Sequence, residues 1–464
     1  MKRLFIVALL AGCTTVGPDY ERPEVALPAI YPGAEAQDAA PRPAAEWWRS
    51  FDDARLDELV AAARAANSDL RLAAARVQEA EGLAREAGAA YYPEVLAGAA
   101  ASRSRVSTRT APPGGAPLER TQYQLLASTS FEIDFWGRYA RTAEAARAKL
   151  LGARYAHALV ELTLTGAVAQ AYFALRALDA QLAVLDETLR LRAESLAIAR
   201  ARLQAGLAAE LDVYQAQAAL TEAQVQRRET ARSRALVERQ LAALTGRLDL
   251  RLAARTPGPG LFALPVPPAP PPGLPSALLE RRPDIRAAEQ QLVAANALIG
   301  TARAELFPSI SLTGALGAQS AELSELLSSG AGIWSLGFGL ALPIFDAGRR
   351  SARVEQAEAR REQALAVYQR SIESGFREVS DALVNLAETA ASEAELRSRL
   401  AAARGALELS TLRYESGYSP YLEVLDAQRT ANDAELALVR NRLARLVFSV
   451  DLMKALGGGW RELK

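Results

Sequence analysis

The chain has 464 residues, of which 54 are basic and 54 acidic, so its formal net charge is zero. A neutral chain argues against nucleic acid as the main partner, because binding of phosphates needs a basic surface. The single histidine, His157, nearly excludes a chemistry built on histidine, and it lies within a helical pattern, as a surface or packing residue would. A chain of this length has room for about two to four domains.

The first residues have the features of an export signal. Lys2 and Arg3 form a basic start, and the apolar core from Leu4 to Leu10 is too short to span a bilayer as a helix, which takes about 20 residues. The segment ends in Leu10-Ala11-Gly12-Cys13, which resembles the bacterial lipobox. We therefore predict a signal peptide over residues 1–12 and a covalent lipid, palmitate included, on Cys13. The alternative is a chance cysteine near an ordinary cleavage site.

An extended segment is expected over residues 13–50, because prolines are frequent between Pro18 and Pro43. Proline lacks an amide donor and resists both helix and sheet. The first structural repeat is predicted over residues 51–256. It begins with a helix, followed by two strands at about 93–105 and 122–136. Along the second strand, apolar side chains alternate with polar or small ones, and the apolar face carries Tyr123, Leu125, Ala127, Thr129, Phe131, Ile133 and Phe135.

A very long helix is predicted after these strands, from Gly137 to about Gln204, where there is no proline and almost no glycine. At about 1.5 Å per residue it would be roughly 100 Å long. Leucines from Leu175 to Leu203 hold most a and d positions of a heptad pattern, which Arg192 and Ala199 interrupt. A turn at Gly206 follows, and the chain is expected to return as a helix over residues 207–245.

The second half of the chain repeats the first. The motif Arg202-Leu203-x-x-Gly206 recurs as Arg413-Tyr414-x-x-Gly417 at an offset of 211 residues. Upstream, Pro93 matches Pro308 at an offset of 215. Such self-similarity at a fixed offset indicates two tandem structural repeats.

A proline-rich segment over residues 257–275 separates the copies and is predicted to be an extended linker. The second repeat, over residues 276–464, is predicted to contain a helix, strands at about 308–319 and 333–345, and a second long helical hairpin. Its strands show the same alternation, with Trp334, Leu336, Phe338, Leu340, Leu342 and Ile344 on one face and mainly glycine and serine on the other.

The strands favour a membrane barrel, in which one face contacts lipid and the other lines a lumen. A soluble sheet with one face on a core would alternate in the same way. Strand lengths near the 9–11 residues that span a bilayer, small residues on the second face and the export signal favour the membrane. Four strands cannot close a barrel, since the smallest known have about eight. Open edges in lipid are costly, so two or three chains must share one barrel.

Several motifs together resemble the lipoprotein branch of the TolC-type outer-membrane factors, which includes OprM-like and NodT-like proteins. The resemblance covers essentially the whole chain. The motifs that carry it are Val16-Gly17-Pro18-Asp19-Tyr20 with Arg22-Pro23, Trp47-Trp48 with Phe51-Asp52-Asp53, Leu279-Glu280-Arg281-Arg282-Pro283-Asp284-Ile285, Leu306-Phe307-Pro308-Ser309-Ile310, and Gly417 with Tyr421-Leu422-Glu423-Val424-Leu425-Asp426-Ala427-Gln428.

The resemblance implies an α+β membrane protein. Three copies would form a barrel with four strands from each chain, continued by a long α-helical barrel in the periplasm. It implies a passive exit duct of a multidrug efflux pump in the outer membrane of a Gram-negative bacterium. The implied partners are two further copies of the chain, a periplasmic membrane-fusion adaptor and an inner-membrane pump of the resistance-nodulation-division type. No enzyme activity, metal or cofactor is expected apart from the lipid on Cys13.

The resemblance also assigns candidate site residues. The turns at Gly206 and Gly417 would form the periplasmic tip, where the adaptor docks. Glu423 and Asp426 fall where the family has acidic rings at the entrance, and their spacing of three puts them on one helix face. Asp212 and Tyr414 fall where family members hold the tip shut. Ser419 stands where some members have arginine, so one latch is expected to be absent. A solvated helix end is the alternative reading of all four residues.

Two other functions stay open at the level of sequence. A duct for secreted proteins would share the fold, although the lipobox and the motif from Val16 to Pro23 favour efflux. A lipid-anchored structural coiled coil would explain the long helices, but it would not need four alternating strands.

Overall fold

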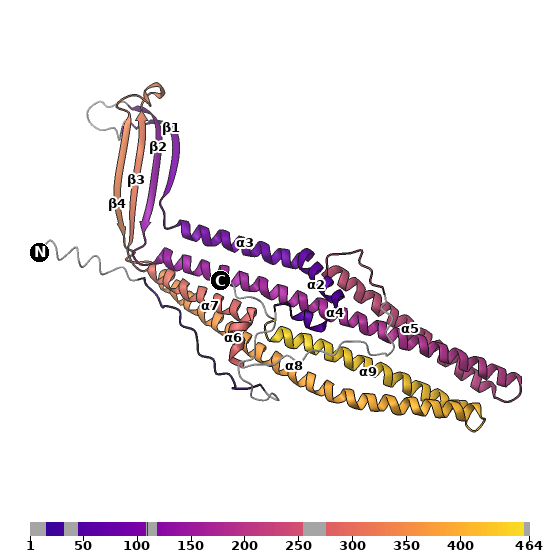
Figure 1. Cartoon of the computed structure of the whole chain (residues 1–464). Helices are drawn as coiled ribbons and strands as arrows, with labels where there is room; N and C mark the ends of the chain where they lie inside the picture. The colour runs from indigo at the N-terminus through magenta and orange to yellow at the C-terminus, as the bar shows by residue number, and fades with distance from the viewer. Residues whose placement is uncertain (1–14, 32–44, 108, 110–117, 254–274, 459–464) are drawn as a thin grey trace. The chain divides into compact units, whose positions relative to one another are not determined.

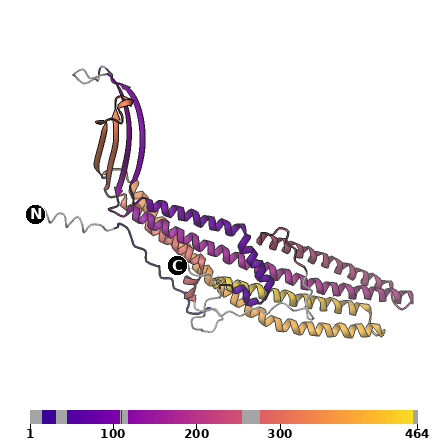
Figure 2. The ribbon, with the colours of Figure 1, turned by 45° about the horizontal axis from the view of Figure 1, so that its top comes forward.

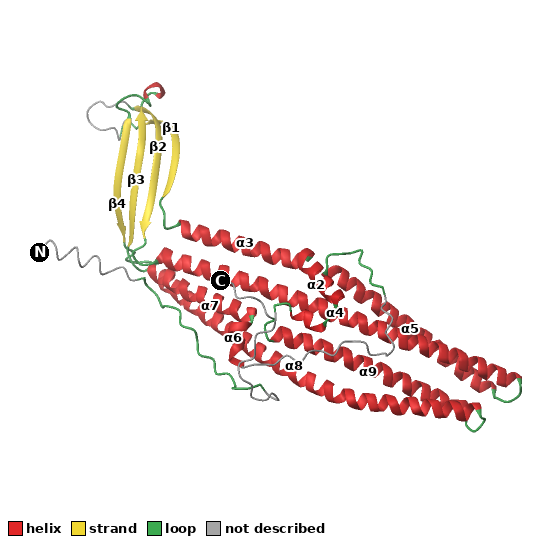
Figure 3. Cartoon of the chain, in the orientation of Figure 1, coloured by secondary structure: helices red, strands yellow, loops and turns green. Residues whose placement is uncertain are grey.

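A computed structural model describes residues 15–31, 45–107, 109, 118–253 and 275–458. The predicted signal peptide, Cys13 and all of the predicted linker except Pro275 lie outside these residues. Figures 1 and 3 show the helices and strands, which in chain order are η1 (Trp47–Phe51), α2 (Ala54–Ala66), α3 (Ser68–Ala89), β1 (Glu94–Arg105), β2 (Glu119–Ile133), α4 (Arg138–Gln204), α5 (Glu210–Leu244), η2 (Pro275–Ala277), α6 (Leu278–Arg281), α7 (Pro283–Ala304), β3 (Ser309–Ser320), η3 (Leu323–Glu325), β4 (Gly332–Ala341), α8 (Arg349–Glu415) and α9 (Tyr421–Ala455).

The chain forms two compact units, and each is assembled from both sequence repeats. Unit 1 comprises Met1–Glu24, Val77–Ala153 and Ala288–Tyr368, and unit 2 comprises Val25–Arg76, Arg154–Ala287 and Gln369–Lys464. Unit 1 therefore contains the whole sheet, and unit 2 contains both returning helices, α5 and α9. The units do not coincide with the predicted repeats because equivalent elements of the two repeats pack together.

The sheet of unit 1 has four antiparallel strands in the order β1-β2-β3-β4, which Figures 1 and 2 show side by side. Its register puts Ala97, Ala127, Leu316 and Trp334 opposite one another in one row. Residues directly opposite in a ladder point to the same side of the sheet. The apolar faces predicted for the second and fourth strands therefore lie on the same side of the sheet and form one apolar face together with Ala97 and Leu316.

This apolar face is exposed rather than packed against a core. The side chains of Trp334, Leu336, Phe338 and Leu340 on β4 are between 63 and 77 % exposed. A soluble sheet with this pattern would bury them under another layer. Their exposure favours lipid contact over the alternative of a soluble sheet.

Two strands end earlier than the alternation predicts. β2 ends at Ile133 and not at 136, because Asp134 accepts a hydrogen bond from the amide of Ala140 at 2.8 Å and so caps the start of α4. β4 ends at Ala341 and not at 345, because Pro343 has no amide donor for the ladder. β2 also begins three residues earlier than predicted, at Glu119, which pairs with Arg105.

The predicted internal duplication is confirmed by the element bounds. α4 and α8 each have 67 residues, and α5 and α9 each have 35. Both ends of α8 and of α9 lie 211 residues after the corresponding ends of α4 and α5. β3 likewise begins and ends 215 residues after β1.

The helix predicted before the strands is divided in both repeats. In the first repeat, Asn67 separates α2 from α3, and its side-chain oxygen accepts hydrogen bonds from the amides of Asp69 at 2.8 Å and Leu70 at 3.2 Å. This is the geometry of a helix N-cap, so a new helix begins there. In the second repeat, Arg282 and Pro283 make the equivalent break between α6 and α7.

The main core lies in unit 2, where α4 packs against the residues of η1 and α2. Trp47, Phe51, Leu59, Val168 and Phe173 are all buried in it. A stretch of α4 is long and apolar enough to cross a membrane by length and composition, but 56 % of that stretch is buried inside the protein. We therefore assign it to the core of the helical part.

The heptad pattern of α4 continues through the two positions that interrupt its leucines. Ala199 is fully buried beside Leu196, and Arg192 is also buried, although it is charged. The guanidinium of Arg192 donates a hydrogen bond to the Ala219 carbonyl of α5 at 2.5 Å. Both residues therefore belong to the packed face of α4 and do not break it.

Candidate functional site

The first helical hairpin ends in a turn at Gly206. This glycine has a φ of +70°, and its amide donates to the Leu203 carbonyl at 3.0 Å. The amide of Leu207 donates to the Arg202 carbonyl at 2.9 Å. These two bonds form a Schellman ending, in which glycine takes a left-handed conformation that other residues disfavour.

The second hairpin ends in a turn of the same geometry. Gly417 has a φ of +80°, and its amide donates to the Tyr414 carbonyl at 3.0 Å. The amide of Tyr418 donates to the Arg413 carbonyl at 2.8 Å. The duplication at an offset of 211 therefore extends from the sequence motif to individual hydrogen bonds.

Each turn presents a large apolar side chain to solvent. Leu207 is 76 % exposed and Tyr418 is 81 % exposed. Leu211 and Leu422, in the first turns of α5 and α9, are also exposed. Exposed apolar side chains at adjoining positions are typical of a surface that contacts another protein.

The two predicted acidic residues lie at the start of α9, and both are exposed. Glu423 is in the first turn of the helix, where a negative charge is favourable. The carboxylate of Glu423 is 4.0 Å from the guanidinium of Arg413. The carboxylate of Asp426 is 2.8 Å from the guanidinium of Arg429. Each acid therefore has a basic neighbour, which the sequence pattern did not reveal.

The predicted pair Asp212 and Tyr414 belongs to the same end of unit 2, but no hydrogen bond joins the two side chains. Tyr414 is buried, and its hydroxyl has no hydrogen-bond partner among the described residues. Its ring packs against the ring of Tyr421, with centroids 5.5 Å apart. A latch between Asp212 and Tyr414 stays a prediction.

The residue that holds Tyr414 in this chain is Arg202, which sequence reasoning missed. The guanidinium carbon lies 4.5 Å from the centre of the Tyr414 ring. The same group donates to the Tyr414 carbonyl at 2.9 Å and to the Glu415 carbonyl at 3.3 Å. Its place in the repeated motif with Gly206 was the available signal, but the motif does not show which residue the side chain contacts.

Beneath the turns, a small apolar cluster buries two tyrosines. Leu196 and Ala199 of α4 pack with Tyr414, Tyr421 and Val424. Burial raises the pKa of the Tyr421 hydroxyl above its ordinary value, so the group stays neutral. The cluster is therefore uncharged, and the charges of this end lie around it on Arg202, Glu423 and Asp426.

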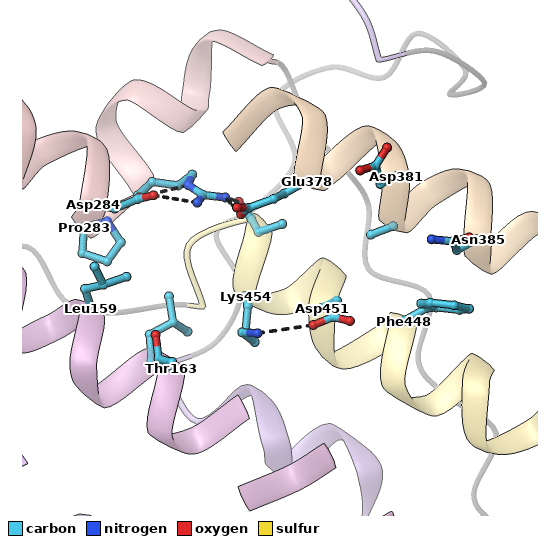
Figure 4. A pocket seen from close by; sticks show the side chains of 14 residues that line it. Leu159, Thr163, Pro283, Asp284, Glu378, Asp381, Asn385, Phe448, Asp451 and Lys454 are labelled. Atoms are coloured by element: carbon cyan, nitrogen blue, oxygen red, sulfur yellow. Dashed lines mark hydrogen bonds and ion pairs between the residues drawn. The ribbon is translucent and has the colours of Figure 1, made fainter. Parts of the chain in front are cut away.

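A second candidate is a cavity of about 390 Å³ in unit 2, shown in Figure 4. Arg282 is one of the residues that line it. The Arg282 guanidinium donates to Asp284 at 2.7 Å and to the Ala455 carbonyl at 3.0 Å, and it contacts Glu378 at 2.8 Å. Burial alone would lower the pKa of Arg282, but its bonds to Asp284 and Glu378 outweigh burial and raise the pKa. Arg282 thus joins α7, α8 and α9, and we interpret the cavity as part of a structural joint.

Comparison with known proteins identifies the family of this arrangement. The profile of the outer membrane efflux protein family matches residues 59–247 and 274–458. The chain is 37 % identical over 462 residues to the outer membrane protein OprJ of Pseudomonas aeruginosa, with 98 % of this chain and 95 % of that protein covered.

One further relative and one solved structure are similar to this chain over nearly its whole length. The chain is 35 % identical over 475 residues to the solvent efflux pump outer membrane protein SrpC of Pseudomonas putida, with 98 % of this chain and 97 % of that protein covered. The solved structure of the outer-membrane channel OprN superposes with a TM-score of 0.88 at 31 % identity, covering 96 % of this chain and 100 % of that one.

Proposed function

Because this chain belongs to the outer membrane efflux protein family, we propose that three copies of it form the outer-membrane exit duct of a tripartite efflux pump. The family and these relatives are pump components of the outer membrane, not enzymes. Relatives named for solvent and toluene efflux indicate small apolar molecules as one class of cargo. The duct is passive, and its inner-membrane partner, of the resistance-nodulation-division type, drives transport.

The observation that carries this proposal is the sheet with an exposed apolar face. In the part of the chain that the structure describes, β1 and β4 each pair with a single neighbour. In lipid, their outer backbone groups would be left without partners at several kcal/mol each, so a closed barrel must include other copies. Three copies supply twelve strands, the number that the family resemblance implies.

Aromatic side chains mark the end of the sheet that adjoins the helices. The indole of Trp136 donates to the Pro308 carbonyl at 2.8 Å and stacks on Phe307, with ring centroids 4.6 Å apart. Tryptophan in such a position is typical of a membrane–water interface. We place the periplasmic surface of the outer membrane at this level.

The proposed lipid on Cys13 fits the same level. The amide of Val16 donates to the Trp136 carbonyl at 3.0 Å. Cys13 precedes Val16 by three residues, a tether of about 10 Å when extended. Two ion pairs hold the segment after Val16 on unit 1: Asp19 pairs with Arg141 at 2.7 Å, and Arg22 pairs with Glu289 at 2.6 Å. A lipid on Cys13 would thus enter the bilayer beside the indole ring of Trp136.

The turns at Gly206 and Gly417 are the proposed docking surface for the periplasmic adaptor. Leu207 and Tyr418 offer apolar contacts there. Glu423 and Asp426 of three chains would form two rings at the entrance, which attract cations and repel anions. Asp212 and Tyr414 remain proposed members of the closed gate.

Single-channel current in a planar lipid bilayer tests the proposal, with purified full-length protein whose oligomeric state is known. We expect a trimer that gives discrete, cation-preferring current steps. Since a sealed tip would hide the pore, the same measurement is made with Arg202→Ala. Protein that stays monomeric in lipid would overturn the proposed duct. Trimers that carry no current, either unaltered or with Arg202→Ala, would overturn it as well.

A further inference from the structure

Arg202 joins the two helical hairpins of one chain at their turns. It lies near the end of α4, and its guanidinium donates to the carbonyls of Tyr414 and Glu415 at the end of α8. The last carbonyls of a helix have no partner within the helix and carry the negative end of its dipole. The cation also lies 4.5 Å from the centre of the Tyr414 ring. One side chain therefore binds the helix end and the ring together.

Arg413 is the counterpart of Arg202 in the second repeat, yet it makes no such contact within the described part of the chain. It precedes Gly417 by four residues, as Arg202 precedes Gly206, and both turns have the same hydrogen bonds. Its side chain is 60 % exposed, and its nearest partner among the described residues is Glu423 at 4.0 Å. That separation is too long for a hydrogen bond.

A closed ring of three chains gives Arg413 a place to bind. Hairpins of the first and second repeat alternate around such a ring. The two hairpins have equivalent bounds and the same turn hydrogen bonds, so they suit a ring in which they are related by half of the rotation between neighbouring copies. In such a ring the second hairpin meets the first hairpin of the next copy as the first meets the second, and the contact of Arg202 would be repeated across each boundary between chains.

We propose that the guanidinium of Arg413 donates hydrogen bonds to the carbonyls of Leu203 and Gln204, at the end of α4 in the neighbouring copy of the chain. We call this contact, and the equivalent contact of Arg202 with the end of α8, a clasp. Leu203 and Gln204 are the equivalents of Tyr414 and Glu415 at the offset of 211. The proposal rests on the proposed function, because it needs the ring of three copies.

The two kinds of clasp differ in one residue. Tyr414 gives Arg202 an aromatic ring, whereas Leu203 at the equivalent position offers Arg413 none. A cation over an aromatic ring gains a contribution that a leucine does not supply. The clasps between chains are therefore weaker than those within chains, so the tip opens first at the three boundaries between copies.

Pairs of cysteines test the geometry, in the full chain with Cys13→Ser to leave no other thiol. Arg413→Cys with Gln204→Cys should give covalent trimers with a short bifunctional thiol reagent. The matched control, Arg202→Cys with Glu415→Cys, should react within each chain and leave monomers on a denaturing gel. Monomers from the first pair, in trimers where the control pair reacts, would overturn the clasp between chains. Absence of trimers before cross-linking would instead overturn the proposed duct.

A double-mutant cycle tests the energetic difference, with open probability in a planar bilayer as the readout. The cycle is measured in an Arg202→Ala background, in which we expect openings to be frequent enough to count. There Leu203→Tyr should lower open probability by about two- to five-fold for each clasp. The same change should have no effect once Arg413→Ala is also present. An equal decrease with and without Arg413 would show that the new ring acts on its own and would overturn the proposal.

Discussion

The guanidinium of Arg202 lies over the ring of Tyr414, 4.5 Å from its centre, although the two residues are 212 positions apart in the chain. Arg202 thus joins the two turns of one chain. The hydroxyl of Tyr414 has no partner among the described residues, so the ring and the carbonyl of this residue make the contact. Arg202 therefore contacts a residue that the family resemblance assigns to the gate, while the latch between Asp212 and Tyr414 stays a prediction.

Arg202→Ala should open the tip. The change removes a cation–π contact of about 0.5–2 kcal/mol and two charge-assisted hydrogen bonds. We expect open probability in a planar bilayer to rise about tenfold or more, since a loss of about 1.4 kcal/mol corresponds to tenfold. Arg200→Ala is the matched control, because Arg200 bonds to Gln217 within its own hairpin. Equal effects of both changes would contradict a specific role for Arg202.

Neutralising the proposed acidic rings should reduce cation preference. With Glu423→Gln and Asp426→Asn together, the reversal potential in a salt gradient should move toward zero, because six negative charges leave the entrance of a trimer. Arg429→Gln should move it the other way, since Arg429 pairs with Asp426 at 2.8 Å and offsets its charge. An unchanged reversal potential in both variants would mean that these side chains do not face the pore.

Much of the fold could be predicted because its signals are local or repeated. The offsets of 211 and 215 showed that the second half repeats the element order of the first, and the period of two gave the apolar faces of the second and fourth strands. The divided helices were missed because a single polar residue, Asn67, caps α3 through its side chain, and asparagine is common elsewhere in loops. The early end of β4 was missed although Pro343 indicates it, because apolar alternation continues beyond the proline to Ile344.

The candidate site could be predicted only in part. Its turn glycines follow from the motifs, since a left-handed residue is needed to end both long helices. The role of Arg202 could not be predicted, because it depends on which of several nearby carbonyls and rings the side chain reaches. The burial of Arg192 could not be predicted for the same reason. A charged residue at a heptad position suggests that the packed face of the helix is interrupted there, but the hydrogen bond to the Ala219 carbonyl allows Arg192 to be buried.

Cys13→Ser should abolish lipid labelling but leave the N-terminal segment docked. Arg22 bonds to Glu289 through two nitrogen atoms, at 2.6 and 3.0 Å, and these bonds do not depend on the lipid. Metabolic labelling with a radioactive fatty acid measures the first effect. Protection of residues 15–24 from proteolysis in purified trimers measures the second. Labelling that persists in the variant would rule out the lipobox interpretation.

Gly417→Ala and Gly405→Ala should change stability in opposite directions. A Cβ at either position would meet no atom within 4 Å, so packing does not decide the outcome. Gly417 has a φ of +80°, where alanine costs about 1–2 kcal/mol. Gly405 lies inside α8, where alanine is favoured by about 0.5–1 kcal/mol. The apparent melting temperature of the trimer in detergent checks the prediction, and a shift of the same sign in both variants would contradict it.

Glu393 should make stability depend on pH in acid. This buried carboxylate of α8 bonds to Arg397 at 2.5 Å and to Arg442 and Arg445 of α9 at 3.2 and 2.7 Å. Burial alone would raise its pKa, but the bonds from Arg445 and Arg397 outweigh burial, and the pKa lies below its ordinary value. A depressed pKa in the folded state stabilises the protein above the unfolded pKa of about 4.3. That stabilisation is lost as pH falls through the folded pKa.

Glu393→Gln should therefore destabilise the helical hairpin at neutral pH by about 3–5 kcal/mol, because it leaves three clustered guanidinium groups without their carboxylate. The difference from the unaltered protein should narrow as the pH falls below the unfolded pKa, because the unfolded chain then binds a proton at Glu393 that the folded protein still resists. Melting temperatures from pH 7 down to pH 3 measure this convergence. Glu395→Gln, two positions along α8 at an exposed site, serves as the control and should leave the whole curve unchanged. A difference between Glu393→Gln and the unaltered protein that stays constant with pH would show that glutamine fails for steric reasons and not through its charge.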